Sequence, residues 1–358
     1  MTRLFFRVKR MAIGTSLVAL VAVLAVGCGS SSKSSGSASG SSSRASTKGA
    51  GAPASGKTYT VGIDIPYHPL FDYVEAKEAH YFAGKPYTVK FKVLDATTQV
   101  PAFGAGQLDV MTTVPSFIPR VKDQYGISTA EFFPLARWTI GPQILVPKNS
   151  PYTTLASLKG KTVVIPPLST RFGAEEAAIL AVTGQNIRTY FHLVQTDAAP
   201  QQLALGRADA GFLEAPTTYP LLASGKFNAI YSVHDAFLKA LGDPAVVNGG
   251  FIAKTTFLKD PANQDFVHTL VGAIQDAWNK YNQDPNAVNQ VASQVSGVPP
   301  AQLKVVGQVL DLNGIPKSKR AITPQDVVTW SKIFPLLAKS GFIKTAPANP
   351  ASVFIITK

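Results

Sequence analysis

Alternating apolar and polar positions recur along the first two thirds of the chain, and apolar residues at helical spacing follow most of these stretches. The alternation is clearest at residues 58–65 and 87–93, where β-branched side chains are frequent. Further strands are predicted at residues 108–113, 143–146, 161–165, 190–194 and 210–213, and helices at 70–81, 100–106, 154–158, 172–182 and 200–205. Strands that alternate with short helices predict an α/β fold with parallel sheets.

The pattern changes after about residue 248, where longer helices are predicted. Residues 264–281 carry apolar side chains on one helical face. Asp284 and Thr323 each stand directly before a proline, which is typical of a helix N-cap followed by its first helical residue. Pro335 is expected to kink or end the last of these helices. Two strand-rich parts followed by a helical tail predict two lobes, with the tail returning to the first.

The N-terminal part has a different composition. A basic start, an apolar run at residues 11–26 and a junction of small residues together form the pattern of a secretory signal peptide. The only cysteine of the chain, Cys28, follows that junction, so no disulfide within the chain is expected. Residues 29–57 are almost all Ser, Gly and Ala with a few basic residues, which predicts a flexible tether that spans roughly 30 Å.

The junction Leu24-Ala-Val-Gly-Cys28 resembles a bacterial lipobox, although Ala25 stands where that motif usually has Leu. The resemblance implies cleavage before Cys28 and a lipid on this cysteine. The protein would then be extracytoplasmic and lipid-anchored to the bacterial cell membrane. A soluble secreted protein and an uncleaved anchor helix remain as alternatives.

Charge and spacing exclude several function classes. The formal net charge is +13, and removal of the signal with its four basic residues leaves about +9. The positive charges are scattered, with no basic stripe that contains aromatic residues, so no nucleic acid partner is expected. The histidines are dispersed, so no metal site is expected. Neither a Gly-x-Ser-x-Gly motif nor a phosphate-binding loop occurs, and no cofactor is expected.

Two segments about a hundred residues apart share one pattern: a helix, Gly-x-x-Asp, a short strand and a loop marked by proline. The first contains Gly106 and Asp109, and the second contains Gly206 and Asp209. We expect the glycine to end the helix in a left-handed turn, which the aspartate caps. Because ligands bind beyond the carboxyl ends of strands in open α/β sheets, each lobe is expected to contribute one such loop to a cleft.

Four stretches resemble the solute-binding proteins of ABC importers, in the group for nitrate, sulfonate, taurine and thiamine precursors. They are VGIDIPYHPLF, AFGAGQLDV with its Pro-Ser loop, TLASLKGKTVVIPPLSTRFG and LALGRADAGFLEAP, within a resemblance over residues 58–342. The resemblance implies a type II periplasmic-binding-protein fold. In this fold two α/β lobes are joined by a two-stranded hinge, here near residues 141–146 and 246–251, with a helical C-terminal tail packed on lobe 1.

The resemblance also implies an organisation and a function. The expected parts are a signal peptide at 1–27, the lipidated cysteine and tether at 28–57, lobe 1 at 58–145, lobe 2 at 146–248, and the return to lobe 1 with the C-terminal helices at 249–358. The implied protein is a monomeric, non-enzymatic receptor that passes a small-molecule solute to an ABC permease. One alternative is a tethered sensor. Another is a pyrimidine-synthase-like enzyme, whose cysteine-rich motif this chain lacks.

Candidate solute contacts lie mostly in the loops that follow predicted strands. Ser169 and Thr170 precede a predicted helix, where they would form an anion site or simply cap the helix. Arg171 has the fork geometry for a carboxylate, sulfonate or phosphonate, whereas Glu214 would favour an amine. The full candidate set is Tyr67, His68, Pro115, Ser116, Trp138, Ser169, Thr170, Arg171, Glu214, Thr217 and Asn248.

The aromatic candidates leave the solute class open. Tyr67 and His68 follow the first predicted strand, where family members place cleft residues, and Trp138 would either wall the cleft or pack in the core. Asn248 at the second crossover is a candidate hydrogen-bonding partner. The basic groups favour an organic anion, and the aromatic groups with Glu214 favour a heterocycle such as a pyrimidine precursor.

Overall fold

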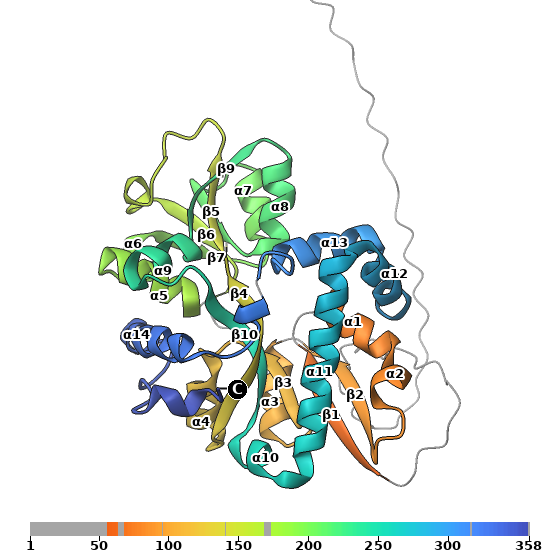
Figure 1. The fold of residues 1–358 in the computed structure, drawn as a ribbon. Coiled ribbons are helices and arrows are strands. Elements are labelled where there is room, and N and C mark those ends of the chain that lie inside the picture. The colour runs from red at the N-terminus through yellow and green to blue at the C-terminus, as the bar shows by residue number, and fades with distance from the viewer. Residues whose placement is uncertain are drawn as a thin grey trace, which may run out of the picture. The chain divides into compact units, whose positions relative to one another are not determined.

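The computed structural model describes residues 56–63, 68–94, 96–139, 141–167, 173–315 and 317–356. Contacts divide the chain into Met1–Gly51 and Ala52–Lys358, and all described residues belong to the second unit. The predicted signal peptide, Cys28 and almost all of the tether therefore lie outside the described residues. Within the described part, the strands form two five-stranded sheets (Figure 1).

The first sheet, with the helices that cover it, is called lobe 1. Its strand order is β2-β1-β3-β10-β4. The strands are β1 (Lys57–Ile63), β2 (Tyr87–Val93), β3 (Val110–Thr113), β4 (Thr129–Trp138) and β10 (Val246–Lys254). Strands β1, β2 and β3 pair in parallel, and β10 pairs antiparallel with both β3 and β4.

The second sheet, with its helices, is called lobe 2 and repeats this topology. Its order is β7-β6-β8-β5-β9. The strands are β5 (Gln143–Pro147), β6 (Thr162–Ile165), β7 (His192–Gln195), β8 (Ala210–Leu213) and β9 (Phe227–Ser232). Here β5 is the antiparallel strand. Each sheet is therefore parallel, as expected, except for one antiparallel strand, β10 in lobe 1 and β5 in lobe 2.

Helices cover both sheets. Lobe 1 carries α1 (Pro69–Ala76), α2 (Glu78–Phe82), α3 (Ala96–Gly104), α4 (Phe117–Tyr125), α10 (Thr255–Lys259), α11 (Pro261–Gln283) and α12 (Pro285–Ser296). Lobe 2 carries α5 (Gly173–Thr183), α6 (Ile187–Tyr190), α7 (Ala199–Ala204), α8 (Ala215–Ala223) and α9 (Val233–Leu241). The remaining α-helices are α13 (Pro300–Val309) and α14 (Pro324–Ser340), with short 3-10 turns at Ala156–Leu158, Lys317–Lys319 and Pro350–Val353.

The chain crosses between the lobes twice, and the two crossovers lie beside each other. The end of β4 pairs with the start of β10, with Trp138 opposite Val246. Because β5 already pairs in the second sheet and β10 in the first, residues 143–145 belong to lobe 2 and residues 246–248 to lobe 1. The predicted boundaries between the lobes, after residues 145 and 248, stay predictions.

The repeated Gly-x-x-Asp segments have the same geometry in both lobes. Gly106 and Gly206 adopt the left-handed conformation, with φ of 75° and 68°, as predicted. The aspartates, however, bind the neighbouring parallel strand and do not cap the turn. Asp109 accepts a hydrogen bond from the backbone N–H of Thr60 at 2.8 Å, and Asp209 accepts one from Thr162 at 2.9 Å. Each aspartate therefore binds the backbone of the parallel strand beside it, which is β1 for Asp109 and β6 for Asp209.

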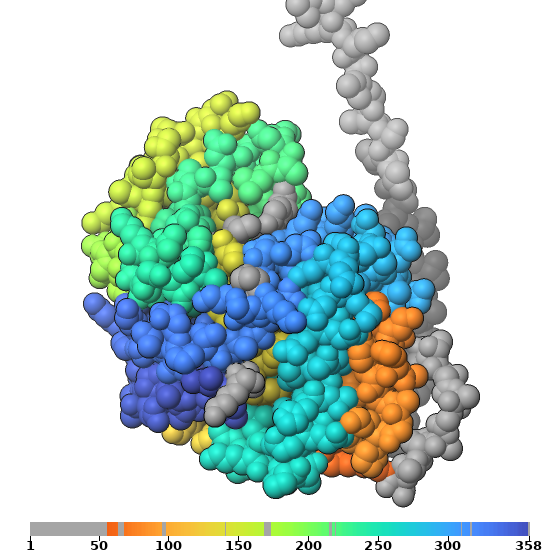
Figure 2. All heavy atoms as spheres, viewed as in Figure 1, coloured from red at the N-terminus to blue at the C-terminus, as the bar shows by residue number. Residues whose placement is uncertain are grey.

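The helical tail packs on both lobes. Helix α11 buries its apolar face in lobe 1, and α12 begins at the predicted N-cap Asp284. Helix α14 begins at Thr323 with a capping box and continues through Pro335 to Ser340, so Pro335 does not end it. It packs against α5 of lobe 2, and Figure 2 shows its blue surface meeting the green surface of that lobe. The expectation of a tail on lobe 1 alone was therefore incomplete.

Candidate functional site

Four helices begin where parallel strands of the two lobes end. In lobe 1, α1 follows β1 with His68 as its N-cap, and α4 follows β3 with Ser116 as its N-cap. In lobe 2, α5 follows β6, and α8 follows β8 with Glu214 as its N-cap. A helix N-terminus presents free backbone N–H groups and a partial positive charge. The carboxyl ends of both sheets thus carry helix starts that suit an anionic group.

His68 is a buried hydrogen-bond donor at the start of α1. Its Nδ1 accepts a hydrogen bond from the backbone N–H of Leu70 at 3.2 Å, and its ring packs edge-on against Phe71. Burial lowers the pKa of His68 to about 3, so the imidazole is neutral at physiological pH. Because Nδ1 is the acceptor, the ring proton lies on Nε2. That Nε2–H has no hydrogen-bond partner among the described residues.

The two predicted loop residues of lobe 1 after β3 are buried. Pro115 and Ser116 lie directly before α4, and Ser116 is almost fully inaccessible to solvent. The Ser116 side chain makes no capping hydrogen bond to the helix. The Ser116 hydroxyl therefore does not cap α4.

In lobe 2, Glu214 lies at the N-terminus of α8, and the exposed Thr217 donates its hydroxyl hydrogen bond to the Glu214 carbonyl at 2.8 Å. Thr217 is thus positioned by a local turn of the helix. A contact between Thr217 and solute stays a prediction.

Sequence reasoning missed Glu175, the third residue of α5. Its side chain is completely buried, and neither carboxyl oxygen has a hydrogen-bond partner among the described residues. Burial raises the pKa of the Glu175 carboxyl well above its usual range, and the neighbouring charge of Glu214 raises it further. A signal was present in the sequence. Two adjacent glutamates stand in the first turn of a helix whose other residues are mostly Ala and aliphatic, and such a composition is typical of a buried helix.

The adjacent Glu176 has an ordinary ion-pair partner. Arg188 donates to its carboxylate at 3.1 Å. Arg120 of α4 also lies near enough to act on Glu176, and its guanidinium stacks on the rings of Phe117 and Phe342. The first turn of α5 therefore carries one paired and one unpaired carboxyl group.

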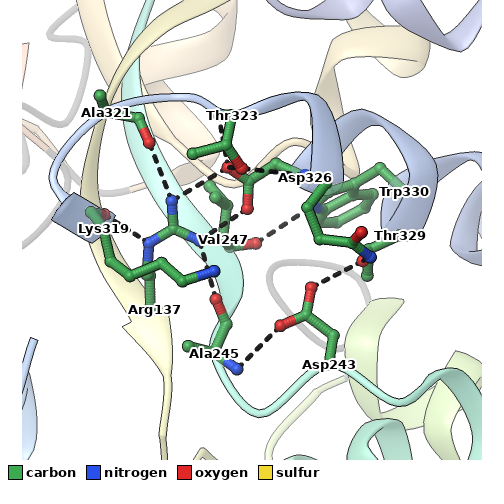
Figure 3. Close-up of polar contacts among 11 residues, drawn as sticks. Arg137, Asp243, Ala245, Val247, Lys319, Ala321, Thr323, Asp326, Thr329 and Trp330 are labelled. Atoms are coloured by element: carbon green, nitrogen blue, oxygen red, sulfur yellow. Dashed lines mark hydrogen bonds and ion pairs between the residues drawn. The ribbon is translucent and has the colours of Figure 1, made fainter.

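A separate polar cluster ties the C-terminal helix to the crossover (Figure 3). Arg137, at the end of β4, forms a two-pronged contact with Asp326 at 2.6 and 3.0 Å, and both side chains are about 1% exposed. Arg137 also donates to three backbone carbonyls, those of Ala245, Lys319 and Ala321. Burial acts to raise the pKa of Asp326, but hydrogen bonds from Arg137 and Thr323 outweigh it and hold the pKa below its usual value.

Trp138 and Asn248 lie beside this cluster. Trp138 is buried, with ring centroids 5.6 Å from Phe237 of lobe 2 and 6.4 Å from Trp330 of α14. It therefore packs in the core that joins the lobes, which was one of the two expected roles. Asn248 is half-buried within β10. The solute contacts predicted for Trp138 and Asn248 stay predictions.

The structure places the predicted residues in three groups. Those at helix starts are His68, Pro115, Ser116, Glu214 and Thr217, and those near the crossover are Trp138 and Asn248. Tyr67, Ser169, Thr170, Arg171 and the lipidation candidate Cys28 lie outside the described residues.

Two cavities lie elsewhere in lobe 1. One of about 340 Å³ is lined by residues that include Lys57, Asp109 and Lys254, and the other of about 470 Å³ lies beside α3. Neither is lined by a predicted site residue. Across the described part of the chain, no group of three or more potential ligand side chains could hold a metal ion. Helices in the same part fall short of the length and apolarity that a membrane crossing requires.

Comparison with known proteins points to one family. A family profile described as ABC transporter, phosphonate, periplasmic substrate-binding protein matches residues 65–236. The periplasmic aliphatic sulphonate binding protein SsuA from Escherichia coli has a TM-score of 0.65 at 14% identity, over 85% of this chain and 94% of that one. The alkanesulfonate-binding protein SsuA from Xanthomonas axonopodis pv. citri, bound to MOPS, has a TM-score of 0.61 at 18% identity, over 84% of this chain and 99% of that one.

An enzyme has a similar fold. The desulfurization enzyme DSZB has a TM-score of 0.53 at 15% identity, over 83% of this chain and 96% of that one. No curated protein matches the chain. At these identities the structural likenesses show the fold, and they confirm the expected two-lobed α/β architecture of periplasmic binding proteins.

Proposed function

We propose that the chain is a substrate-binding protein of the ABC-transporter type, which captures a small organic sulfonate or phosphonate between its lobes and delivers it to a permease. The observation that carries this proposal is the set of helix starts at the strand ends of both lobes. Helices α1, α4, α5 and α8 all begin there. Their free N–H groups, with the unpaired Nε2–H of His68, are donors of the kind that acidic oxygens accept.

The mechanism follows from the two crossovers. A solute that contacts both lobes gains its full set of contacts only when they are close together, so binding favours the closed state. The paired ends of β4 and β10 are the natural hinge. The permease would recognise the closed form.

The proposed location is outside the cytoplasm. A protein with the predicted signal peptide and lipidated Cys28 would be held on the outer face of the membrane by the tether at residues 29–57. Globomycin should cause an uncleaved precursor, larger by the signal peptide, to accumulate, and a labelled fatty acid should be incorporated into the unaltered protein but not into Cys28→Ala. Absence of the label from the unaltered protein would contradict lipid anchoring.

A thermal-shift screen of the purified full chain tests the solute class. At about 100 times its dissociation constant, a solute adds about 2.7 kcal/mol to the free energy of unfolding, which raises the melting temperature by several degrees. We expect such shifts with alkanesulfonates or alkylphosphonates and none with sulfate at equal ionic strength. Shifts only with pyrimidines or other neutral heterocycles would overturn the assigned class.

The predicted anion site gives a second test. Ser169→Ala combined with Arg171→Ala should weaken solute binding at least about tenfold, equivalent to about 1.4 kcal/mol, because a charge-assisted contact is lost. The ligand-free melting temperature should stay the same. Unchanged affinity, measured by isothermal titration calorimetry, would remove these residues from the site.

A further inference from the structure

Basic side chains gather at the end of lobe 2 that lies opposite its helix starts. They come from the end of β5 and from the turns before β6, β8 and β9, and we call them the basic edge: Lys148, Lys159, Lys161, Arg207 and Lys226. We propose that this edge binds a surface of anionic phospholipid headgroups. The inference goes beyond the proposed function, since it draws on the proposed location at a membrane and not on the solute.

The sheet of lobe 2 brings these residues together. Strands β6, β8, β5 and β9 are consecutive neighbours in it. Strand β6 is parallel to β8, and β5 runs antiparallel to both β8 and β9, so the end of β5 lies beside the starts of the other three strands. The backbone N–H of Lys148 donates to the carbonyl of Lys226 at 2.8 Å. With about 4.8 Å between neighbouring strands, the row of basic residues extends over about 14 Å.

Little negative charge balances the basic edge. The segments that form it, residues 147–161, 204–209 and 224–227, contain a single acidic residue, Asp209. Its carboxylate already accepts a hydrogen bond from the backbone N–H of Thr162 at 2.9 Å. Four of the five basic side chains are exposed and the fifth is half-buried, and none of them forms an ion pair with a described residue. The edge therefore attracts anions from the solvent side.

The corresponding edge of lobe 1 shows that the fold does not require these charges. Gly106 and Gly206 make the same left-handed turn, yet Gln107 follows the first and Arg207 follows the second. The cavity of about 340 Å³ at that edge is lined by two basic and two acidic side chains among others, Lys57, Lys254, Asp109 and Asp260. Opposite charges thus balance in lobe 1, whereas positive charge accumulates in lobe 2.

The shape of the basic edge favours a surface over a single anion. Its residues start from four strands, and the outermost two strands are about 14 Å apart, whereas one anion needs donors that converge on it. A bilayer with anionic lipid presents many phosphates in one plane and attracts basic residues within about a Debye length. The predicted tether at residues 29–57 spans at most about 100 Å when fully extended, so lobe 2 can reach the membrane that would hold Cys28.

Two variants that remove equal charge test this inference. The edge variant replaces one basic residue on each strand, as Lys148→Gln, Lys161→Gln, Arg207→Gln and Lys226→Gln. The control variant replaces four exposed lysines that are scattered over lobe 1 and the C-terminal helices, as Lys77→Gln, Lys90→Gln, Lys304→Gln and Lys332→Gln. Every chain is full-length and also carries Cys28→Ala, so that no lipid is attached.

Sedimentation with lipid vesicles measures the binding. On phosphatidylcholine vesicles with about 30% phosphatidylglycerol, the edge variant should bind at least about tenfold more weakly than the chain with Cys28→Ala alone. The control variant should stay within about threefold of that chain. Pure phosphatidylcholine vesicles measure the contribution of the apolar N-terminal segment, which should be equal in all three chains. The loss in the edge variant should shrink in about 0.5 M NaCl, because salt screens exposed charges.

Two outcomes would overturn the inference. Unchanged binding of the edge variant would remove any role of the basic edge, and an equal loss in both variants would assign the attraction to net charge alone. The edge variant should keep its melting temperature and its solute affinity, because its altered residues lie at the surface and away from the helix starts. Failure of the unaltered chain to bind any solute would overturn the proposed function and leave the vesicle result standing.

Discussion

Arg137 and Asp326 beside the crossover and Glu175 in lobe 2 are all buried titratable residues, yet their electrostatic surroundings are opposite. Arg137 and Asp326 neutralise each other, and the guanidinium is further bound by three carbonyls. The Glu175 carboxyl oxygens have no hydrogen-bond partner among the described residues, and the charge of Glu214, which acts on them, is of the same sign. The pKa values follow this difference, since Asp326 is held below its usual value and Glu175 above it.

The difference separates a charge that is paired inside the protein from one that is not. The paired cluster connects the crossover to α14, elements that are distant in sequence (Figure 3). A buried charge without a partner reduces the stability of the folded protein.

The largest effect should come from breaking the paired cluster. Asp326→Ala leaves the Arg137 guanidinium buried without a counter-charge and removes the capping box of α14, which should cost about 3–5 kcal/mol. Urea unfolding measures this loss. The double variant Arg137→Met with Asp326→Leu should recover part of it, because no charge is left uncompensated. A loss below about 1 kcal/mol in the single variant would show that the pair is not structural.

Removing the unpaired charge should have the opposite sign. Glu175→Gln should stabilise the ligand-free protein at pH 8 by about 1–2 kcal/mol, since it deletes an uncompensated buried carboxylate. Because the folded-state pKa of Glu175 is raised, its favourable contribution is complete below the pKa of the unfolded chain and is lost as the pH rises. The stability difference between the variant and the original protein should therefore grow from pH 4 to pH 8.

Urea unfolding at several pH values tests this dependence. Burial also raises the pKa of Glu131, so the stability of the original protein changes with pH for more than one reason. The quantity to measure is therefore the difference in stability between the original protein and Glu175→Gln at each pH. A pH-independent difference, or a destabilised variant at pH 8, would show that Glu175 has a partner inside the protein.

The smallest effect is expected at an exposed pair. Lys280 contacts Asp276 at 2.7 Å, but both side chains are more than a third exposed. Solvent screens such pairs, and Lys280→Met should cost about 0.3–0.5 kcal/mol. The loss should shrink further in 0.5 M NaCl. A cost comparable to that of Asp326→Ala would mean that burial is not what distinguishes these pairs.

The local sequence predicted individual elements well. The strand at 210–213 has the predicted bounds, and both expected caps, Asp284 and Thr323, begin their helices. Elements without a strong local signal were missed, among them α4 and α9. Pro335 does not end α14, because burial of Trp330, Phe334 and Leu337 on both sides of it holds the helix together.

The residues of the candidate site were likewise predictable from the sequence only in part. The sequence placed His68, Ser116 and Glu214 in loops that follow predicted strands, and the structure adds that each of them stands at the start of a helix. It gave no way to see that the neighbouring glutamates 175 and 176 differ, because only the folded chain brings Arg188 to one and Glu214 to the other.

The sequence by itself determined what depends on neighbouring residues: alternation, helix caps, left-handed glycines and the family resemblance. The tertiary structure decided which charges are paired. Arg137 meets Asp326 across 189 residues, and no local pattern encodes that contact. Electrostatic energy depends on distance and burial in space. The buried carboxyl groups of Asp326 and Glu175 therefore differ because the fold brings an arginine to the first and not to the second among the described residues.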